Sequence, residues 1–417
     1  MKVIGLITEY NPFHYGHLYH LKKAKEITNS DFSIAVMSGS FVQRGEPSLV
    51  DKWTKAKMAI DNGIDLVLEL PTIYAVQSAE LFAYGGIKLL DSLNIVDYLC
   101  FGSEEGNIES LKKIAEILVD EPKNFKIKLK YYLDKGNSFP VSRSMAIDEY
   151  FKNDTNINLN PASIMNSPNN ILGIEYLKAL YKYNIDIVPI TIKRIGSEYK
   201  EEQLNNKIAS ATAIRKKALK NNLSDLKSYI PSNTYNHLVN YLSQYSSLNA
   251  LENYSQILLY LLRTTDKKYL SKIMDMEDGL ENRLIQYSFK YNDINQVIDN
   301  IVTKRYTRTR IQRILAHLML NLDKPTFLRL NNVYPKYIRA LGMNKNGMKL
   351  LKEIKNNTTI PIINKFSDYK KYHDSMLEEM IHYDKLATDL FFLGLHDEKN
   401  RYGNKDFTTS PYIKTQG

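Results

Sequence analysis

The feature that most constrains the fold lies at the start of the chain, where an apolar run precedes a polar loop and a helical pattern. The run at residues 3–7 is rich in β-branched side chains and suits a buried strand, whereas Leu18, Leu21 and Ala24 recur at helical spacing. The order is therefore strand, tight loop, helix. Such a junction points the first backbone N–H groups of the helix, and the positive end of its dipole, beyond the strand. We expect an anion to bind there.

The alternation of strands and helices continues to about residue 105. Apolar runs at residues 32–37, 66–70 and 96–101 are separated by helical patterns at 52–62 and 75–90. Strands joined by helices of about ten or more residues form parallel β-α-β units, with a sheet covered on both faces. The predicted class is therefore α/β, with a Rossmann-like parallel sheet in a first domain at residues 1–220.

Beyond residue 220 the pattern becomes helical, with many leucines and tyrosines and no clear strand alternation. The formal net charge of +10 is also unevenly divided: residues 1–220 hold 28 basic and 26 acidic side chains, whereas residues 221–417 hold 28 and 20. A basic surface of this kind favours a polyanionic partner. We predict a helical, basic domain at residues 221–417 that binds RNA.

The basic segment of this second part interleaves arginines with an aromatic residue and hydroxyls. Its candidate RNA-binding residues are Arg305, Arg308, Arg310 and Arg313. Guanidinium groups neutralise backbone phosphates and stack on unpaired bases. The alternative is a basic helix that only faces solvent, which would have the same sequence pattern.

Two imidazoles bracket a glycine at the start of the first helix. His14, Gly16 and His17 form a His-x-Gly-His sequence, in which the glycine permits close backbone approach and the imidazoles donate to phosphate oxygens. Placed after a strand and before a helix, the sequence resembles the signature of the adenylyl-transferring α/β superfamily. The alternative is a set of histidines that merely decorate a helix start.

A second nucleotide signature lies about 190 residues later. Residues 208–215 resemble the Ile-Ser-Ser-Thr-x-Ile-Arg motif of nucleotidyltransferases and keep Ser210, Thr212 and Arg215, which predicts a site for the β- and γ-phosphates. Alone, the hydroxyls would be ordinary helix caps. Class I aminoacyl-tRNA synthetases share His-x-Gly-His but use a Lys-Met-Ser-Lys-Ser loop, and no such run occurs in this chain, so an amino-acid-charging enzyme is disfavoured.

Two further candidates have a second interpretation. The loop at residues 38–47, with two glycines and Arg44, suits either a phosphate-facing lid or a solvated turn. Asp51 precedes a helix, where it either caps that helix or orients a substrate or a magnesium ion.

The single cysteine, Cys100, excludes a disulfide framework and a multi-thiolate metal site, and no protein-bound metal is predicted.

No apolar run approaches the roughly 20 residues needed to span a bilayer, and no signal-type segment opens the sequence. We therefore expect a cytoplasmic protein with no membrane partner.

The motifs together resemble the tRNA(Met) cytidine acetate ligase family. The resemblance covers essentially the whole chain, and the segments that carry it are residues 5–17, 37–47, 101–104 and 168–177. It implies a ligase that activates acetate with ATP as acetyl-adenylate and acetylates N4 of the wobble cytidine of elongator tRNA(Met). AMP and pyrophosphate are released, and Mg²⁺ arrives with ATP.

The resemblance also implies roles for individual residues. His14 and His17 stabilise charge at the α-phosphate, and Ser210, Thr212 and Arg215 hold the leaving phosphates. The nucleotide-binding set is Ile7, Asn11, His14, Gly16, His17, His20, Gly102, Asn169 and Arg194. From its position alone, His20 is also compatible with a structural role. The alternative function is a small-molecule nucleotidyltransferase that transfers adenylyl groups in coenzyme synthesis.

Overall fold

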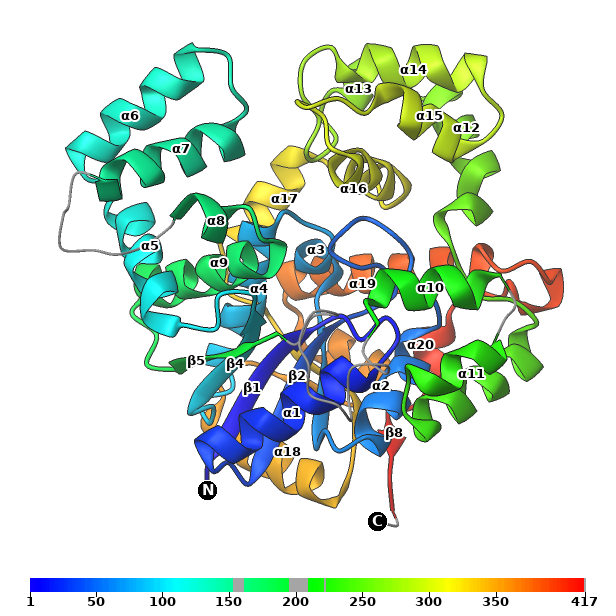
Figure 1. The fold of residues 1–417 in the computed structure, drawn as a ribbon. Coiled ribbons are helices and arrows are strands. Elements are labelled where there is room, and N and C mark those ends of the chain that lie inside the picture. The colour runs from blue at the N-terminus through cyan, green and yellow to red at the C-terminus, as the bar shows by residue number, and fades with distance from the viewer. Residues whose placement is uncertain (153–160, 195–208, 221–222, 416–417) are drawn as a thin grey trace.

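The computed structural model describes residues 1–152, 161–194, 209–220 and 223–415. In these residues the chain forms one eight-stranded sheet with the order β5-β4-β1-β2-β3-β6-β7, and β8 pairs with β6 (Figure 1). The strands are β1 (Val3–Thr8), β2 (Phe32–Ser38), β3 (Leu66–Leu70), β4 (Tyr98–Ser103), β5 (Val188–Lys193), β6 (Ile338–Met343), β7 (Ile362–Ile363) and β8 (Tyr412–Ile413).

The first five strands are parallel throughout, which confirms the predicted α/β class. β3 is buried along its whole length and β1 over its first four residues, as expected of strands covered on both faces. The helices of this part are α1 (Tyr15–Thr28), α2 (Lys52–Asp61), α3 (Thr72–Ala75), α4 (Ala79–Asp91), α5 (Ile108–Asp120), α6 (Lys123–Asp134), α7 (Phe139–Lys152), α8 (Pro161–Met165), α9 (Pro168–Tyr183) and α10 (Ala211–Leu219).

The next part of the chain is helical, as predicted. Figure 1 shows α12 to α15 projecting away from the sheet, with α16 beneath them. The elements are η1 (Leu223–Ser228), α11 (Ser232–Tyr245), η2 (Leu251–Tyr254), α12 (Ser255–Thr264), α13 (Lys267–Leu270), α14 (Leu280–Lys290), α15 (Ile294–Ile301), α16 (Arg308–Met319) and α17 (Lys324–Asn331).

The end of the chain returns to the sheet, which the sequence pattern did not predict. β6 adds antiparallel to β3, and β8 pairs with β6. The pattern failed here because Arg339, the second residue of β6, is a buried charge that interrupts the apolar run. Its guanidinium forms ion pairs with Glu69 of β3, at 2.9 Å, and with Asp406. The other elements here are α18 (Lys345–Asn357), η3 (Phe366–Tyr372), α19 (Ser375–Leu393), η4 (Glu398–Asn400) and α20 (Lys405–Thr408).

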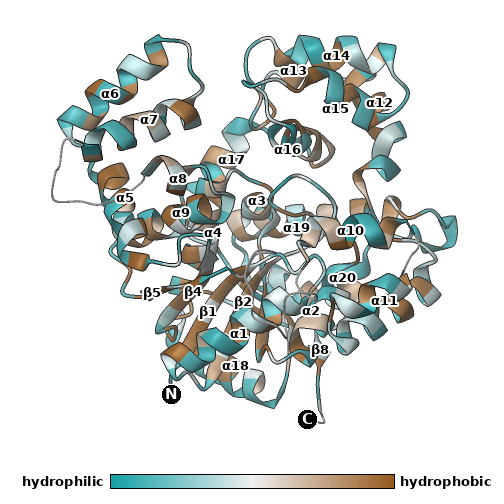
Figure 2. Cartoon of the chain, viewed as in Figure 1, coloured by the Kyte–Doolittle hydropathy of each residue, from teal (hydrophilic) through white to brown (hydrophobic). Residues whose placement is uncertain are grey.

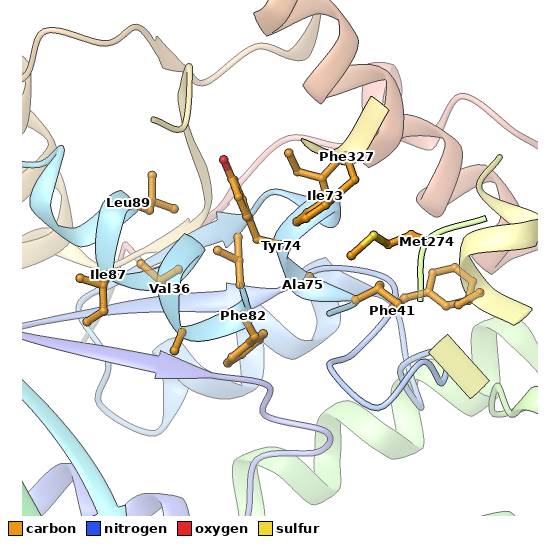
Figure 3. Close-up of a cluster of buried hydrophobic side chains, with 14 of the residues drawn as sticks. Val36, Phe41, Ile73, Tyr74, Ala75, Phe82, Ile87, Leu89, Met274 and Phe327 are labelled. Carbon is orange, nitrogen blue, oxygen red and sulfur yellow. The ribbon is translucent and has the colours of Figure 1, made fainter. Parts of the chain in front are cut away.

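The hydrophobic core is continuous across residue 220. Phe82 of α4 and Tyr74 of α3 belong to the same buried cluster as Met274 and Phe327 from the helical part (Figure 3). Side chains from both sides of residue 220 thus pack in one cluster. The division into two domains, residues 1–220 and 221–417, stays a prediction. Hydrophobic residues mark the central strands in Figure 2. Within the described residues, no helix combines the length and the hydropathy needed to cross a bilayer.

Candidate active site

The site is built at the start of α1, where two histidines cap the helix. His14 is the N-cap, and its Nδ1 accepts a hydrogen bond from the backbone N–H of Gly16 at 3.0 Å. Nδ1 of His17 accepts from the backbone N–H of His14 at 3.3 Å, which closes a reciprocal capping box. The two rings stack, with centroids 3.7 Å apart. Imidazoles here do what a Ser and a Glu do in most capping boxes.

This arrangement fixes the protonation state of both rings. Burial, followed by the nearby Arg194 and Arg215, lowers the pKa of His14 from 6.5 to about 3. Burial and the neighbouring His14 and Arg194 hold the pKa of His17 well below its ordinary value. Both rings are thus neutral near pH 7. Because each Nδ1 accepts a hydrogen bond, the hydrogen-bond network assigns the ring proton to Nε2, which is then a neutral donor.

The second signature lies beside the loop that precedes α1. Nη1 of Arg215, on α10, donates to the backbone oxygen of Asn11 at 3.1 Å, and its Nη2 lies 3.4 Å from the hydroxyl of Thr212. Ser210 is the N-cap of α10, and its hydroxyl accepts from the N–H of Ala213 at 3.2 Å. Ser210 and Thr212 are exposed, so both hydroxyls are accessible to a ligand. Segments about 200 residues apart in sequence therefore meet.

The residues predicted to contact the adenosine or a phosphate lie around the ends of β4 and β5. A Cβ on Gly102 would lie 3.2 Å from Cγ of Arg194, so these two residues are in contact distance. The amide of Asn169 donates to a carboxylate oxygen of Glu104 at 2.5 Å, and the other oxygen accepts from the N–H of Asn170 at 2.9 Å. Glu104 thus ties the end of β4 to the start of α9.

Two members of the predicted nucleotide-binding set are partly buried and pack against other parts of the protein. Nε2 of His20 lies 3.6 Å from Sγ of Cys100 on β4, and burial lowers the pKa of His20 to about 4. Ile7 is partly buried and packs against Gly86 of α4. Their contact with a nucleotide stays a prediction.

Asp51 is the N-cap of α2, as the first of its two interpretations predicted. Its Oδ1 accepts from the N–H of Thr54 at 2.9 Å, and its Oδ2 accepts from the Thr54 hydroxyl at 2.7 Å. The carboxylate is buried, and it lies near Lys55. The capping role is therefore present, and a role toward substrate stays open.

Lys55 is a residue that the sequence reasoning missed. Its buried Nζ donates to the backbone oxygens of Ser38 at 2.7 Å and Glu9 at 3.2 Å, at the ends of β2 and β1. Burial lowers the pKa of Lys55 to about 7. Because α2 also holds Lys52 and Lys57, no local pattern singled out Lys55.

Glu46, also missed, connects the loop at residues 38–47 to Arg215 of the second signature and to α16. Its carboxylate lies 3.7 Å from Nη2 of Arg215 and accepts from Nε2 of Gln312, on α16, at 3.0 Å. A Cβ on Gly45, where φ is +79°, would lie 2.3 Å from the backbone nitrogen of Arg313. The loop is therefore packed between α10 and α16 and is not a solvated turn.

The predicted RNA-binding arginines lie at and before α16, and carboxylates of the helical part already pair with them. Arg313 forms a largely buried ion pair with Asp275 at 2.7 Å, and Arg308 pairs with Asp299. Arg310 and Arg305 both pair with Glu277. Only the Arg305 side chain is exposed by more than half, at 69%. Their contact with RNA stays a prediction.

Among the residues that the structure describes, no three His, Cys, Asp or Glu side chains are grouped so that they could hold a metal ion. Sites that include residues 153–160 or 195–208 lie outside this description.

Comparison with known proteins identifies the family. The family model described as HIGH Nucleotidyl Transferase matches residues 1–406. The tRNA(Met) cytidine acetate ligase of Thermoanaerobacter sp. (strain X514) is 46% identical over 94% of this chain and 95% of its own length. The enzyme of that name from Clostridium perfringens (strain ATCC 13124) is 44% identical over 99% of this chain and its whole length.

Solved structures agree with this grouping. The crystal structure of Thermotoga maritima TmcAL bound with alpha-thio ATP is 32% identical, covers both chains fully and has a TM-score of 0.93. The apo form of the same protein is 33% identical, with full coverage and a TM-score of 0.94. The chain therefore belongs to the HIGH nucleotidyl transferase family and, within it, to the tRNA(Met) cytidine acetate ligases.

Proposed function

We propose that this protein activates acetate with ATP and transfers the acetyl group to N4 of the wobble cytidine of elongator tRNA(Met). The relatives' shared name supports the substrate, and the TmcAL structure with alpha-thio ATP supports ATP as the nucleotide. The observation that carries the mechanism is the stacked, neutral pair His14 and His17 at the start of α1.

The first step is attack of an acetate oxygen on the α-phosphorus of ATP. The bond to the bridging oxygen of the β-phosphate breaks, and pyrophosphate leaves with its electron pair. Nε2–H groups of His14 and His17 donate to the α-phosphate oxygens as charge grows on them. Since both rings are neutral, they stabilise this charge by hydrogen bonding and do not serve as proton donors to the leaving group.

The leaving phosphates are bound by the start of α10. We assign the β- and γ-phosphates to Ser210, Thr212 and Arg215, where exposed hydroxyls, a guanidinium and a helix N-terminus converge. Adenosine lies near Gly102, Asn169 and Arg194. The exposed hydroxyls of Ser210 and Thr212 would contact the hydration shell of a Mg²⁺ ion carried by the ATP phosphates, and such an ion would supply further charge neutralisation there.

In the second step the exocyclic amine of cytosine attacks the acetyl carbon of the adenylate. The bond from that carbon to the phosphate oxygen breaks, AMP leaves, and the nitrogen loses a proton. Because this amine is a weak nucleophile, its placement contributes more than its deprotonation.

The experiment is incubation of the protein with ATP, labelled acetate and unmodified elongator tRNA(Met). We expect labelled tRNA together with AMP and pyrophosphate, each in proportion to the acetyl groups transferred. Turnover of ATP and acetate into a small adenylylated product, with no label in RNA at any divalent-metal concentration, would instead identify a small-molecule nucleotidyltransferase.

A further inference from the structure

One helical hairpin, formed by α6 and α7, exposes many large apolar side chains. Figure 1 shows it projecting from the molecule beyond α5. About a quarter of all large apolar residues exposed in the described chain lie on these two helices: Ile127, Tyr131, Leu133, Phe139, Val141 and Met145. Phe125, Ile147 and Phe151 are buried and pack the hairpin to the body, so the exposed set is not needed for that packing. A patch of this kind marks an interaction surface.

The same hairpin is basic. Residues 123–152 hold seven Lys and Arg against three Asp and Glu, a net charge of +4. Exposed lysines alternate with the exposed apolar residues along α6: Lys126 precedes Ile127, and Lys130 precedes Tyr131. Figure 2 shows the mixture of hydrophilic and hydrophobic residues on both helices. A surface that offers cations and aromatic faces together suits RNA, whose phosphates and unpaired bases need both.

A cavity of about 400 Å³ lies at the base of the hairpin. Tyr84, Tyr183 and Phe139 supply aromatic walls. The charged side chains of the lining are three cations, Arg143, Lys178 and Lys182, and three carboxylates, Glu80, Glu121 and Glu175. Nη1 of Arg143 pairs with Glu175 at 2.8 Å, but its buried Nε has no hydrogen-bond partner among the described residues. A buried donor without a partner costs free energy, which a ligand acceptor would recover. The cavity therefore has the size and the groups to hold an unstacked nucleotide.

We propose that the α6–α7 hairpin and the cavity at its base form a second RNA-binding surface, distinct from the arginines around α16. The inference rests on the proposed function, because that function supplies an RNA substrate. A second copy of this chain fits less well, since a two-fold interface would place the basic hairpin against its own like charge.

The test is a set of variants in the full-length protein. The hairpin variant combines Ile127→Ala, Tyr131→Ala, Lys126→Glu and Lys130→Glu, all exposed positions with good helix formers as replacements. The matched control places the same kinds of change on exposed residues of α18: Met348→Ala, Lys345→Glu and Lys349→Glu. Phe139→Ala tests the place where the exposed hairpin surface meets the cavity, since this exposed side chain also lines the cavity.

Each variant is compared with the wild type for binding of unmodified elongator tRNA(Met), for ATP binding and for thermal unfolding. We expect the hairpin variant to bind tRNA about tenfold more weakly or worse, and its salt dependence to fall, because stacking and phosphate contacts are both removed. Phe139→Ala weakens tRNA binding severalfold. ATP binding and the unfolding temperature stay at wild-type values, and the α18 control matches the wild type throughout.

Wild-type tRNA affinity in both the hairpin variant and Phe139→Ala would overturn the proposal. So would a wild-type protein that sediments as a dimer while the hairpin variant is a monomer, because a second copy would then occupy the surface. Wild-type protein that binds tRNA but transfers no acetate contradicts the proposed function and leaves the comparison of tRNA affinities intact.

Discussion

The imidazoles of His14 and His17 stack 3.7 Å apart, and each accepts a backbone N–H at its Nδ1. This relationship directs the Nε2–H of each ring away from the helix start that it caps. The His-x-Gly-His sequence therefore combines two roles, since the histidines both begin α1 and present neutral donors at its N-terminus.

Removing either donor is expected to slow acetate activation strongly. His14→Ala and His17→Ala each lower the rate of acetyl transfer about 10²–10³-fold, the usual effect of losing one donor to a charged transition state. Steady-state kinetics with saturating ATP, acetate and tRNA measures this. His382→Ala, at an exposed position on α19, is the control and keeps the wild-type rate. Near-wild-type rates in both histidine variants would exclude them from the chemistry.

The lowered histidine pKa values predict a pH dependence. With the pKa of His14 at about 3, neither active-site ring gains a proton as the pH falls from 8 to about 5. The unfolded chain does gain these protons below its ordinary value of 6.5, so the free energy of unfolding decreases as the pH falls through this range.

NMR titration of the imidazole ring protons checks this directly. The resonances of His14 and His17 should stay at neutral-ring positions down to about pH 5, because burial holds the pKa of both rings well below 6.5. Titration of the His14 ring near pH 6.5 would show that it is charged under working conditions and would contradict the mechanism.

Two substitutions of Asp51 distinguish its role as a helix cap from a role toward the substrate. Asp51→Asn keeps an oxygen that accepts from the N–H of Thr54 and is expected to unfold within about 0.5 kcal/mol of the wild type, while Asp51→Ala loses about 1–2 kcal/mol. Denaturant unfolding measures both. We expect acetyl transfer to fall about tenfold in Asp51→Asn because the charge near Lys55 is lost. Wild-type transfer by Asp51→Asn would leave Asp51 as a helix cap alone.

Substitutions of the arginines near α16 are expected to differ in their effect on the free energy of unfolding. Arg313→Glu breaks a largely buried ion pair with Asp275 and places two carboxylates together, which costs about 3–5 kcal/mol of unfolding free energy. Arg305→Glu changes an exposed side chain and costs less than about 0.5 kcal/mol. Weaker tRNA binding by Arg305→Glu at unchanged stability would support RNA contact there, and unchanged binding would remove Arg305 from the RNA site.

The sequence predicted the parallel sheet because β1 to β4 alternate with helices and carry continuous apolar runs. It did not predict β6, because buried Arg339 interrupts the apolar pattern and its partners, Glu69 and Asp406, lie far away in the chain. Partners of buried charges depend on tertiary structure, and no local pattern encodes them.

The same limit applies to the candidate site. His14, His17 and Arg215 were identifiable from local motifs, since both signatures lie at helix starts. The roles of Lys55 and Glu46 were not, because each connects segments that are distant in sequence. Likewise, Arg313 pairs with Asp275, which lies 38 residues away in the chain, so no local pattern indicated that Arg313 has an acidic partner.

The most direct test of the central claim is mass analysis of the wobble nucleoside. Elongator tRNA(Met) is incubated with ATP, acetate and either the wild-type protein or His17→Ala, then digested to nucleosides. The account predicts N4-acetylcytidine at the wobble position with the wild type, none when acetate or ATP is omitted, and very little with His17→Ala. Unmodified cytidine after incubation with the complete wild-type reaction, or acetylation that needs no ATP, would contradict it.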